Sequence, residues 1–279
     1  MENRLQRVLK HFGLSGAAPL AETAIAGLWT ARDRSGNLRV VKIYRKGHFG
    51  NEAGGIALIR AWAGTGACVQ VLDTCEDAML MPWLDGPLLG ARSRAGADLD
   101  ACARLGQLAA TLHRGPLPAL PGLPRLEDWF DALFSLRMAP GCAEALKRDM
   151  GRASALARTL LDDSPPARAL HGDLHHDNVL EAPQGPVAID AKGVLGDPAY
   201  ELANALRNPK GCAAELRDPG HMRARRDILA EHSGTCPSRL ARWGAAKCAL
   251  SIAWRSGGLL QRDAEADLLA LLLAQAEVQ

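Results

Sequence analysis

The sequence predicts an α+β fold in two lobes, an antiparallel sheet followed by a mainly helical region. Three observations support this prediction. Residues 1–85 are rich in predicted strands, with runs of β-branched residues bounded by turn residues. From residue 86 onward, apolar residues recur at intervals of three or four, which is typical of helices with one buried face. The length of 279 residues suits one large or two modest domains.

The predicted sheet has about five strands, which can be located from their bounding turns. Ser35-Gly36-Asn37 has the residues of a hairpin turn, and Glu76-Asp77 separates the last two strands. One helix, at residues 51–63, interrupts the sheet. The expected strands are Pro19–Ile25, Leu28–Arg32, Leu38–Tyr44, Cys68–Leu72 and Ala78–Leu84.

The region after the sheet begins at a predicted hinge, Asp85-Gly86-Pro87, so we expect lobes at residues 1–85 and 86–279. Its first helix has one apolar face, formed by Leu99, Cys102, Leu105, Leu108 and Leu112. Glycines punctuate the later segments. Further helices are expected at 126–138, 142–161, 198–207, 221–233, 238–254 and 261–276.

Composition excludes several classes of protein. Lys and Arg number 33 against 31 for Asp and Glu, and this net charge of +2 gives no broad basic surface for nucleic acid. Seven cysteines without a C-x-x-C pair are typical of reduced thiols. The start, Met1–Phe12, is charged, and the longest late apolar run, Leu268–Ala274, is too short to span a membrane. We expect a soluble, cytoplasmic monomer that binds neither nucleic acid nor membrane.

A non-helical segment, residues 169–196, carries the densest group of polar side chains. Six of the eight residues in 171–178 (HGDLHHDN) could bind a ligand, and a short apolar strand ending at Asp190 follows. A hydrogen-bonded turn would explain one such residue, but the cluster favours a site. Asp173, Asn178 and Asp190 offer the oxygen ligands that Mg²⁺ prefers, with one carboxylate to spare.

These motifs carry a resemblance. H-G-D-x-x-x-x-N followed by I-D resembles the catalytic loop and metal-binding Asp of the protein-kinase-like fold, as found in aminoglycoside O-phosphotransferases. HGDLHHDN, IDAKG, GDPAYELAN and CALSIAW followed by QRD are similar to the streptomycin 6-phosphotransferase and hydroxyurea-resistance kinase family. The resemblance implies a bilobal kinase-like fold, ATP as co-substrate, Mg²⁺, and phosphoryl transfer to a hydroxyl of a small cationic antibiotic, namely the 6-hydroxyl of streptomycin.

The resemblance also implies roles for single residues. Asp173 would be the catalytic base, and Asn178 and Asp190 would bind Mg²⁺. Lys42, in the run VVKIY, would contact the α- and β-phosphates, with Glu52 as its partner. The alternatives are a solvated edge charge for Lys42 and a helix cap for Glu52. His171 would brace the backbone of the catalytic loop rather than react.

The nucleotide base would bind next to the hinge. Pro82 lacks an N–H, so it would offer its C=O to adenine, while the Leu84 N–H serves the ring nitrogen and Met81 lines the pocket. Ordinary core packing is the alternative for these side chains. Only Gly27 is available to a phosphate-covering loop in residues 21–31. Lys192 would contact phosphate or pair with a surface acid.

The acceptor pocket of the family binds a molecule with two guanidinium groups, so the resemblance implies a pocket rich in carboxylates. Its expected wall is the region 198–233, with Asp197 and Glu201 as the first candidates, ahead of Glu215, Asp218, Asp227 and Glu231. Three alternatives remain open. They are a kinase of another small alcohol or a hydroxyurea-like molecule, a metallophosphoesterase with His171, Asp173 and His175 as ligands, and a nucleotide-binding pseudokinase.

Overall fold

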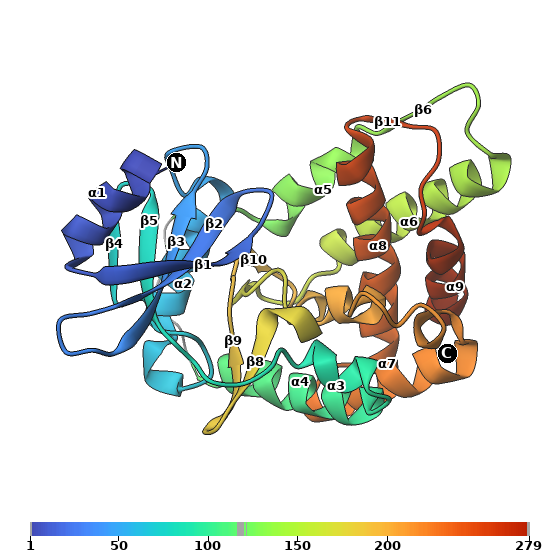
Figure 1. Ribbon diagram of the computed structural model, residues 1–279. Coiled ribbons are helices and arrows are strands. Elements are labelled where there is room, and N and C mark those ends of the chain that lie inside the picture. The colour runs from blue at the N-terminus through green and yellow to red at the C-terminus, as the bar shows by residue number, and fades with distance from the viewer. Residues whose placement is uncertain (1, 116–119, 121, 278–279) are drawn as a thin grey trace.

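The structure, a computed structural model, describes residues 2–115, 120 and 122–277. An antiparallel sheet of five strands forms its N-terminal part, in the order β1-β2-β3-β5-β4 (Figure 1). The register sets Lys42 on β3 opposite Leu28 on β2 and Met79 on β5. The strands are β1 (Ser15–Glu22), β2 (Ala26–Arg32), β3 (Leu38–Tyr44), β4 (Asp73–Cys75) and β5 (Ala78–Pro82).

The two faces of the sheet meet different neighbours because side chains alternate along each strand. Val41 and Ile43 of β3 face helix α1 (Glu2–Phe12), which packs on the outer face through Val8. Val40 belongs to the larger core, which α2 (Ala53–Ala61) and the helical region share. The sheet therefore directs Lys42, on the same face as Val40, toward the rest of the molecule.

Two details of the sheet differ from the sequence-based expectation. Residues 68–72 form no strand; Cys68 makes a single bridge to Ala188, and the edge strand is β4. The N–H of Val69 donates to the backbone oxygen of Ala188 at 2.9 Å, so this β-branched run ties the sheet region to strand β9 (Gly185–Ala188). Helix α1 was not anticipated from the sequence.

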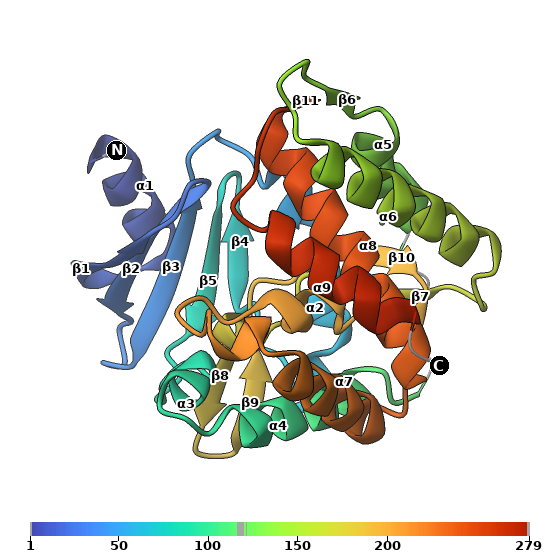
Figure 2. The same cartoon turned by 90° about the vertical axis from the view of Figure 1, so that its right-hand side faces the viewer.

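The C-terminal region is helical, as expected. Helix α8 runs through its centre and is buried over most of its length, with α6 and α9 packed against it (Figure 2). The predicted helix 198–207 is instead a pair of 3₁₀ turns, Pro198–Tyr200 and Ala203–Arg207. The helices are α3 (Gly90–Arg94), α4 (Asp98–Leu112), α5 (Leu126–Phe134), α6 (Glu144–Asp162), α7 (Pro219–Ser233), α8 (Pro237–Ser256) and α9 (Ala266–Glu277).

Short strands hold the segment 168–196 between these two regions. β7 (Arg168–Leu170) pairs with β10 (Val194–Gly196), and β8 (Val179–Ala182) forms a hairpin with β9 (Gly185–Ala188). Because the loops 171–178 and 189–193 leave these strands, both are anchored at each end. A further pair of parallel strands, β6 (Arg137–Met138) and β11 (Leu259–Leu260), lies within the helical region.

All seven cysteines are free, as the sequence predicts. Within the described residues, no helix is both long enough and apolar enough to cross a membrane.

Candidate active site

An ion-pair cluster lies where the sheet meets the helical region. Lys42 stands on β3, the middle strand, and Glu52 immediately precedes α2. Lys42 Nζ lies 2.7 Å from Glu52 Oε2 and 3.0 Å from Asp190 Oδ1. Lys42 and Glu52 are 1% and 2% exposed, and the Glu52 side chain makes no helix-capping hydrogen bond. The alternatives of an edge charge and a helix cap are therefore wrong.

The charges of this cluster stabilise one another. Burial alone would lower the pKa of Lys42, but the carboxylates of Asp190 and Glu52 raise it above its usual value. The Tyr44 hydroxyl donates to Glu52 Oε2 at 2.7 Å, and Lys192 forms an ion pair with Glu52 Oε1. Lys42 therefore remains an ammonium, the form that can neutralise a phosphate oxygen.

The loop after β9 brings Asp190 to this lysine through an uncommon backbone conformation. Asp190 has a φ of 61°, the one positive φ outside glycine in the described part of the chain. A left-handed conformation at a non-glycine residue costs on the order of 1–3 kcal/mol and is common at functional sites. Helix α2 approaches the same loop so closely that a Cβ at Gly55 would overlap the carbonyl oxygen of Ala191.

Asp173 lies in the loop between β7 and β8, and two amide side chains hydrogen-bond to it. Asn204 Nδ2 donates to Asp173 Oδ1 at 2.7 Å, and Asn178 Nδ2 donates to the Asp173 backbone oxygen at 2.8 Å. The Asp173 side chain is partly exposed and lines a cavity. The carboxylate is thus fixed in direction while one side remains open to a bound molecule.

His171 braces the backbone of the loop 171–178, as expected. Its Nε2 lies 2.8 Å from the backbone oxygen of Ile189, and its Nδ1 accepts from the N–H of Asp173 at 3.3 Å. Both ring nitrogens are therefore occupied by the backbone. This geometry leaves His171 no lone pair for a metal, so the metallophosphoesterase interpretation is wrong.

The expectation that Glu201 binds the acceptor is also wrong. Its carboxylate is buried and accepts from the backbone N–H groups of His171 at 2.9 Å and Gly172 at 3.2 Å. His113 Nε2 lies 2.8 Å from the same carboxylate. Burial alone would raise the pKa of Glu201, but the hydrogen bond and charge of His113 bring it below its usual value. Glu201 anchors the loop 171–178.

Asp197 has a similar structural role rather than contact with the acceptor. It is 1% exposed, its Oδ1 caps the following 3₁₀ turn at Ala199, and its Oδ2 accepts from Trp243 Nε1 at 2.7 Å. Arg239 pairs with the same oxygen. Asp197 therefore ties the segment after β10 to helix α8.

The β8–β9 hairpin brings two oxygen donors to one end. Asn178 precedes β8, Asp190 follows β9, and the N–H of Ile189 donates to the Asn178 backbone oxygen at 2.9 Å. The Asn178 amide nitrogen is used by Asp173, which leaves its carbonyl oxygen for a ligand. The Asp190 side chain is 31% exposed. A carboxylate and an amide oxygen side by side fit Mg²⁺, which prefers hard oxygen ligands.

An apolar cavity of about 300 Å³ lies next to Asp190, between the sheet and the β8–β9 hairpin. Met81, Pro82 and Leu84 line it, in the positions where the sequence predicts a base-binding pocket. Among the described residues, the Leu84 N–H has no hydrogen-bond partner. The other lining residues are Leu20, Ala21, Leu28, Val40, Val69, Trp83, Gly86, Leu88, Leu180, Ile189 and Asp190.

Gly27 is not among the residues that line this cavity. It pairs with Ile43 on the face of the sheet that meets α1, and the indole of Trp29 occupies the space that a Cβ at Gly27 would need. Packing against Trp29 thus explains this glycine. A contact of its backbone with phosphate stays a prediction.

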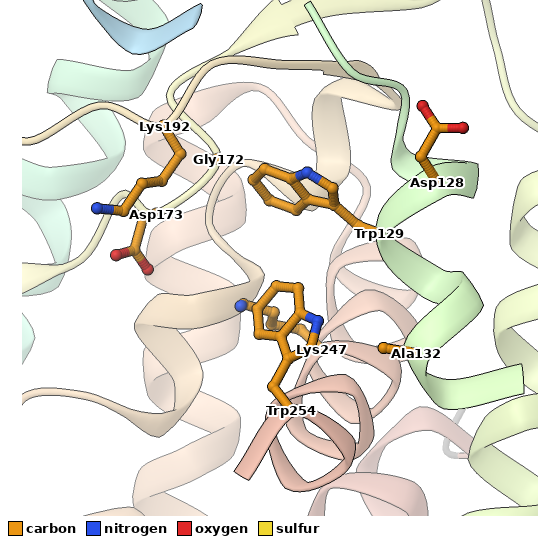
Figure 3. Close-up of a pocket in the computed structure, with 8 residues that line it drawn as sticks. All are labelled: Asp128, Trp129, Ala132, Gly172, Asp173, Lys192, Lys247 and Trp254. Atoms are coloured by element: carbon orange, nitrogen blue, oxygen red, sulfur yellow. The ribbon is translucent and has the colours of Figure 1, made fainter. Parts of the chain in front are cut away.

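A second cavity, of about 470 Å³, borders Asp173 (Figure 3). Asp173 and Lys192 lie along one side, and helices α5 and α8 supply the other. Two of its eight lining residues are carboxylates, and none of the eight comes from the region 198–233. A carboxylate-rich acceptor wall at 198–233 is therefore not found at this cavity. Its lining residues are Asp128, Trp129, Ala132, Gly172, Asp173, Lys192, Lys247 and Trp254.

Several residues of the site were not identified from the sequence. Tyr44 is two positions from Lys42 on the same strand face, so strand alternation was an available signal. Asn204 ends the motif GDPAYELAN, which marks the segment but not its contact with Asp173. Nothing in the sequence identified Trp129 and Lys247 as cavity residues, because helix periodicity alone does not distinguish a cavity wall from the core.

Comparison with known proteins agrees with this geometry. Residues 11–258 match the family described as aminoglycoside/hydroxyurea antibiotic resistance kinase. The streptomycin 3''-kinase of Klebsiella pneumoniae is 35% identical over 217 residues, covering 74% of this chain and 77% of that protein. The streptomycin 6-kinase of Streptomyces griseus is 34% identical over 207 residues, covering 70% and 64%. The hydroxyurea phosphotransferase of Kitasatospora aureofaciens is 29% identical, covering 99% and 80%.

Solved structures show the same fold at low sequence identity. A choline/ethanolamine kinase family protein from Mesorhizobium loti superposes with a TM-score of 0.71 at 16% identity, over 100% of this chain and 96% of that one. A thermostable mutant of aminoglycoside phosphotransferase APH(4)-Ia, in a ternary complex with ADP and hygromycin B, gives 0.64 at 15% identity, over 98% and 99%. This chain, with its protein-kinase-like fold, belongs to the aminoglycoside/hydroxyurea antibiotic resistance kinase family and is an ATP-dependent phosphotransferase.

Proposed function

We propose that this kinase transfers the γ-phosphoryl group of ATP to the 6-hydroxyl of streptomycin and thereby confers resistance. The observation that carries the proposal is the cluster of Lys42, Glu52 and Asp190, which lies beside an apolar cavity large enough for a base. A second cavity borders Asp173, as an acceptor would require. In this proposal residues 1–85 form the nucleotide-binding lobe and residues 86–279 form the catalytic and acceptor-binding lobe.

The nucleotide would enter with its base in the apolar cavity. The Pro82 C=O and the Leu84 N–H would pair with the polar edge of adenine, since proline has a carbonyl oxygen but no N–H to offer. Lys42 would then bind the α- and β-phosphates, with Glu52 holding its ammonium in place. The backbone near Gly27 would cover the phosphates.

Asp190 and Asn178 would hold Mg²⁺ through a carboxylate oxygen and an amide oxygen. When bound, this ion neutralises charge on the β- and γ-phosphate oxygens. Asp190 also contacts Lys42, so one carboxylate orients both cations toward the same phosphates. The 31% exposure of its side chain leaves room for a ligand on the open side.

Asp173 would act as the catalytic base. The attacking hydroxyl oxygen of the acceptor forms a bond to the γ-phosphorus while its proton passes to the Asp173 carboxylate. The bond from the γ-phosphorus to its bridging oxygen breaks, and ADP leaves with that electron pair. A base of this kind adds about 10²–10⁴-fold to the rate. The hydrogen bond from Asn204 supports this role by fixing the direction of the carboxylate.

Streptomycin is proposed as the acceptor because two relatives at 34–35% identity are named as its kinases. Those two names differ in the hydroxyl that is phosphorylated, so the 3''-hydroxyl is the second candidate site of transfer. Another small alcohol or hydroxyurea is the alternative acceptor, supported by the relative at 29% identity. ATP as co-substrate supports action in the cytoplasm, and the proposal takes the enzyme to be a monomer.

The test is turnover by the purified protein. ATP, Mg²⁺ and streptomycin are combined, ADP release is followed in a coupled assay, and the antibiotic is examined by mass spectrometry and NMR. We expect one added phosphoryl group, on the 6-hydroxyl. Asp173→Asn is the matched control and should modify the antibiotic about 10²–10⁴-fold more slowly. Nucleotide binding without turnover of streptomycin, hydroxyurea or any other alcohol would overturn the proposal.

A further inference from the structure

A buried lysine without a charged partner lines the cavity beside Asp173. Lys247 stands in the middle of helix α8 and is 4% exposed. Across the part of the chain that the structure describes, no carboxylate lies within ion-pair distance of its amine. Its one close polar contact is with the ring of Trp254, whose centroid is 4.3 Å from Lys247 Nζ. Burying an unpaired charge is costly, so this lysine calls for an explanation.

The surroundings of Lys247 indicate that its amine faces the cavity rather than the protein core. In Figure 3 its side chain passes behind the Trp254 indole, and its amine emerges on the side where Asp173 stands. Burial lowers the pKa of Lys247 to about 8, an effect that the charge of Asp173 opposes and that of Arg207 reinforces. The Lys247 amine is thus near enough to interact with the charge of Asp173. The Asp173 carboxylate accepts a hydrogen bond from Asn204.

The chemistry of the amine restricts what it can bind. A lysine ammonium has three N–H donors and no lone pair, so its partner must be an acceptor atom such as oxygen. The acceptor hydroxyl that is phosphorylated must stand at Asp173. The oxygen that reaches Lys247 is therefore a second oxygen of the same molecule. The indoles of Trp129 and Trp254 form an apolar wall against which ring carbons can lie.

We propose that Lys247 is a specificity-determining residue that donates a hydrogen bond to a second hydroxyl of the acceptor, adjacent to the hydroxyl that is phosphorylated. The inference rests on the proposed function and narrows its substrate class to polyhydroxylated rings, such as amino sugars and aminocyclitols. An acceptor with a single oxygen-bearing position would leave the Lys247 amine unpaired. Hydroxyurea lies outside the proposed class because it is not a ring and carries no second hydroxyl; its other oxygen is a carbonyl oxygen.

The principal variant is Lys247→Met, which keeps an unbranched apolar side chain shorter by one atom and removes the charged amine. We expect kcat/KM for streptomycin to fall about 10- to 100-fold, the effect of losing one hydrogen bond to a charged donor. ATP affinity should stay unchanged. The melting temperature should stay the same or rise, because the variant removes a buried unpaired charge. A merely structural lysine would instead give a lower melting temperature and unchanged kinetics.

A double-mutant cycle tests directly for the hydrogen bond between Lys247 and the second hydroxyl of the acceptor. NMR of the product locates the phosphorylated hydroxyl, and streptomycin analogues that lack either neighbouring hydroxyl are then compared. Loss of one of these hydroxyls should cost the wild-type enzyme about 10- to 100-fold in kcat/KM and cost Lys247→Met nothing further. Additive losses for both analogues would overturn the inference.

The outcomes separate the inference from the proposed function. Turnover of streptomycin with unchanged kinetics in Lys247→Met leaves the proposed function standing and overturns the inference. Turnover of a different amino sugar, with the expected loss in Lys247→Met, overturns the streptomycin proposal and supports the inference. Preference of the wild-type enzyme for hydroxyurea overturns both.

Discussion

The amine of Lys42 and the carboxylate of Asp190, 148 positions apart in the sequence, lie 3.0 Å from each other. Because Lys42 is on the sheet and Asp190 follows the β8–β9 hairpin, this contact joins the N-terminal sheet to the catalytic segment. Glu52 holds the other side of the same amine at 2.7 Å. An ammonium has three N–H donors, so Lys42 could bind a phosphate oxygen here without giving up both of its carboxylate contacts.

Asp190→Ala should abolish the part of nucleotide affinity that depends on Mg²⁺. The variant removes the carboxylate expected to bind the ion and leaves Lys42 paired with Glu52 alone. Isothermal titration of a non-hydrolysable ATP analogue, with and without Mg²⁺, measures this. Asp227→Ala, which changes an acid at the surface of α7, is the control and should behave as wild type. Equal Mg²⁺ dependence in Asp190→Ala and wild type would contradict the assignment.

Asp173→Asn should separate chemistry from nucleotide binding. The amide keeps the size of the carboxylate and one oxygen to accept from Asn204, but it cannot take a proton. We expect turnover to fall about 10²–10⁴-fold while ATP affinity stays nearly intact. Steady-state kinetics give the first quantity and calorimetry the second. A parallel loss of ATP affinity would assign Asp173 to the nucleotide site instead.

The site residues that could be predicted are those that lie in short sequence motifs. The strand Leu38–Tyr44 was located to the residue, because a β-branched run bounded by a turn needs only local information. Lys42 and Glu52 followed from the kinase-like motif, since Glu52 is the only carboxylate between Lys42 and Asp73. Asp173 and Asp190 were identified from eight-residue and two-residue motifs in the same way.

The parts that failed depend on partners far away in the sequence. Glu201 was expected at the acceptor because the resemblance implies a carboxylate-rich pocket, but its carboxylate is buried and His113, at the end of α4, contacts it. Residues 68–72 have strand composition, yet Val69 bonds to Ala188 across the molecule, so tertiary pairing overrode propensity. Lys192 pairs with Glu52 across 140 positions, which no local pattern encodes.

Stability in acid should depend on the buried Asp98. This carboxylate is 3% exposed and joins α4 to α7 through Arg225 and His221. Burial alone would raise the pKa of Asp98, but the charge of Arg225 lowers it from 3.8 to about 2. The lowered folded-state pKa adds stability above about pH 4, and this stability is lost as the pH falls toward 2. The shift corresponds to about 2 kcal/mol.

Asp98→Asn isolates this contribution because it preserves the shape of the side chain. Urea denaturation at a series of pH values gives the free energy of unfolding for wild type and variant. The difference between them should be largest above pH 4 and shrink by about 2 kcal/mol between pH 4 and pH 2. A difference that does not change with pH would show that the Asp98 charge does not stabilise the fold.

Gly55→Ala should uncouple α2 from the Asp190 loop. A Cβ at position 55 would overlap the carbonyl oxygen of Ala191, so the helix and the loop must move apart. That movement carries Glu52 away from Lys192 and changes the distance between Lys42 and Asp190. A displacement of about 1 Å in a catalytic group can cost about 10²-fold in rate, and we expect a loss of this size in kcat/KM for ATP.

Gly151→Ala supplies the matched control, because this glycine is exposed within α6 and a Cβ there would meet nothing within 4 Å. The control should raise the free energy of unfolding by about 0.5–1 kcal/mol, the usual gain for alanine in a helix, with unchanged kinetics. Thermal unfolding and steady-state kinetics on both variants complete the comparison. If Gly55→Ala also gained stability and kept wild-type kinetics, the close approach of α2 to Ala191 would not be what aligns Lys42 with Asp190.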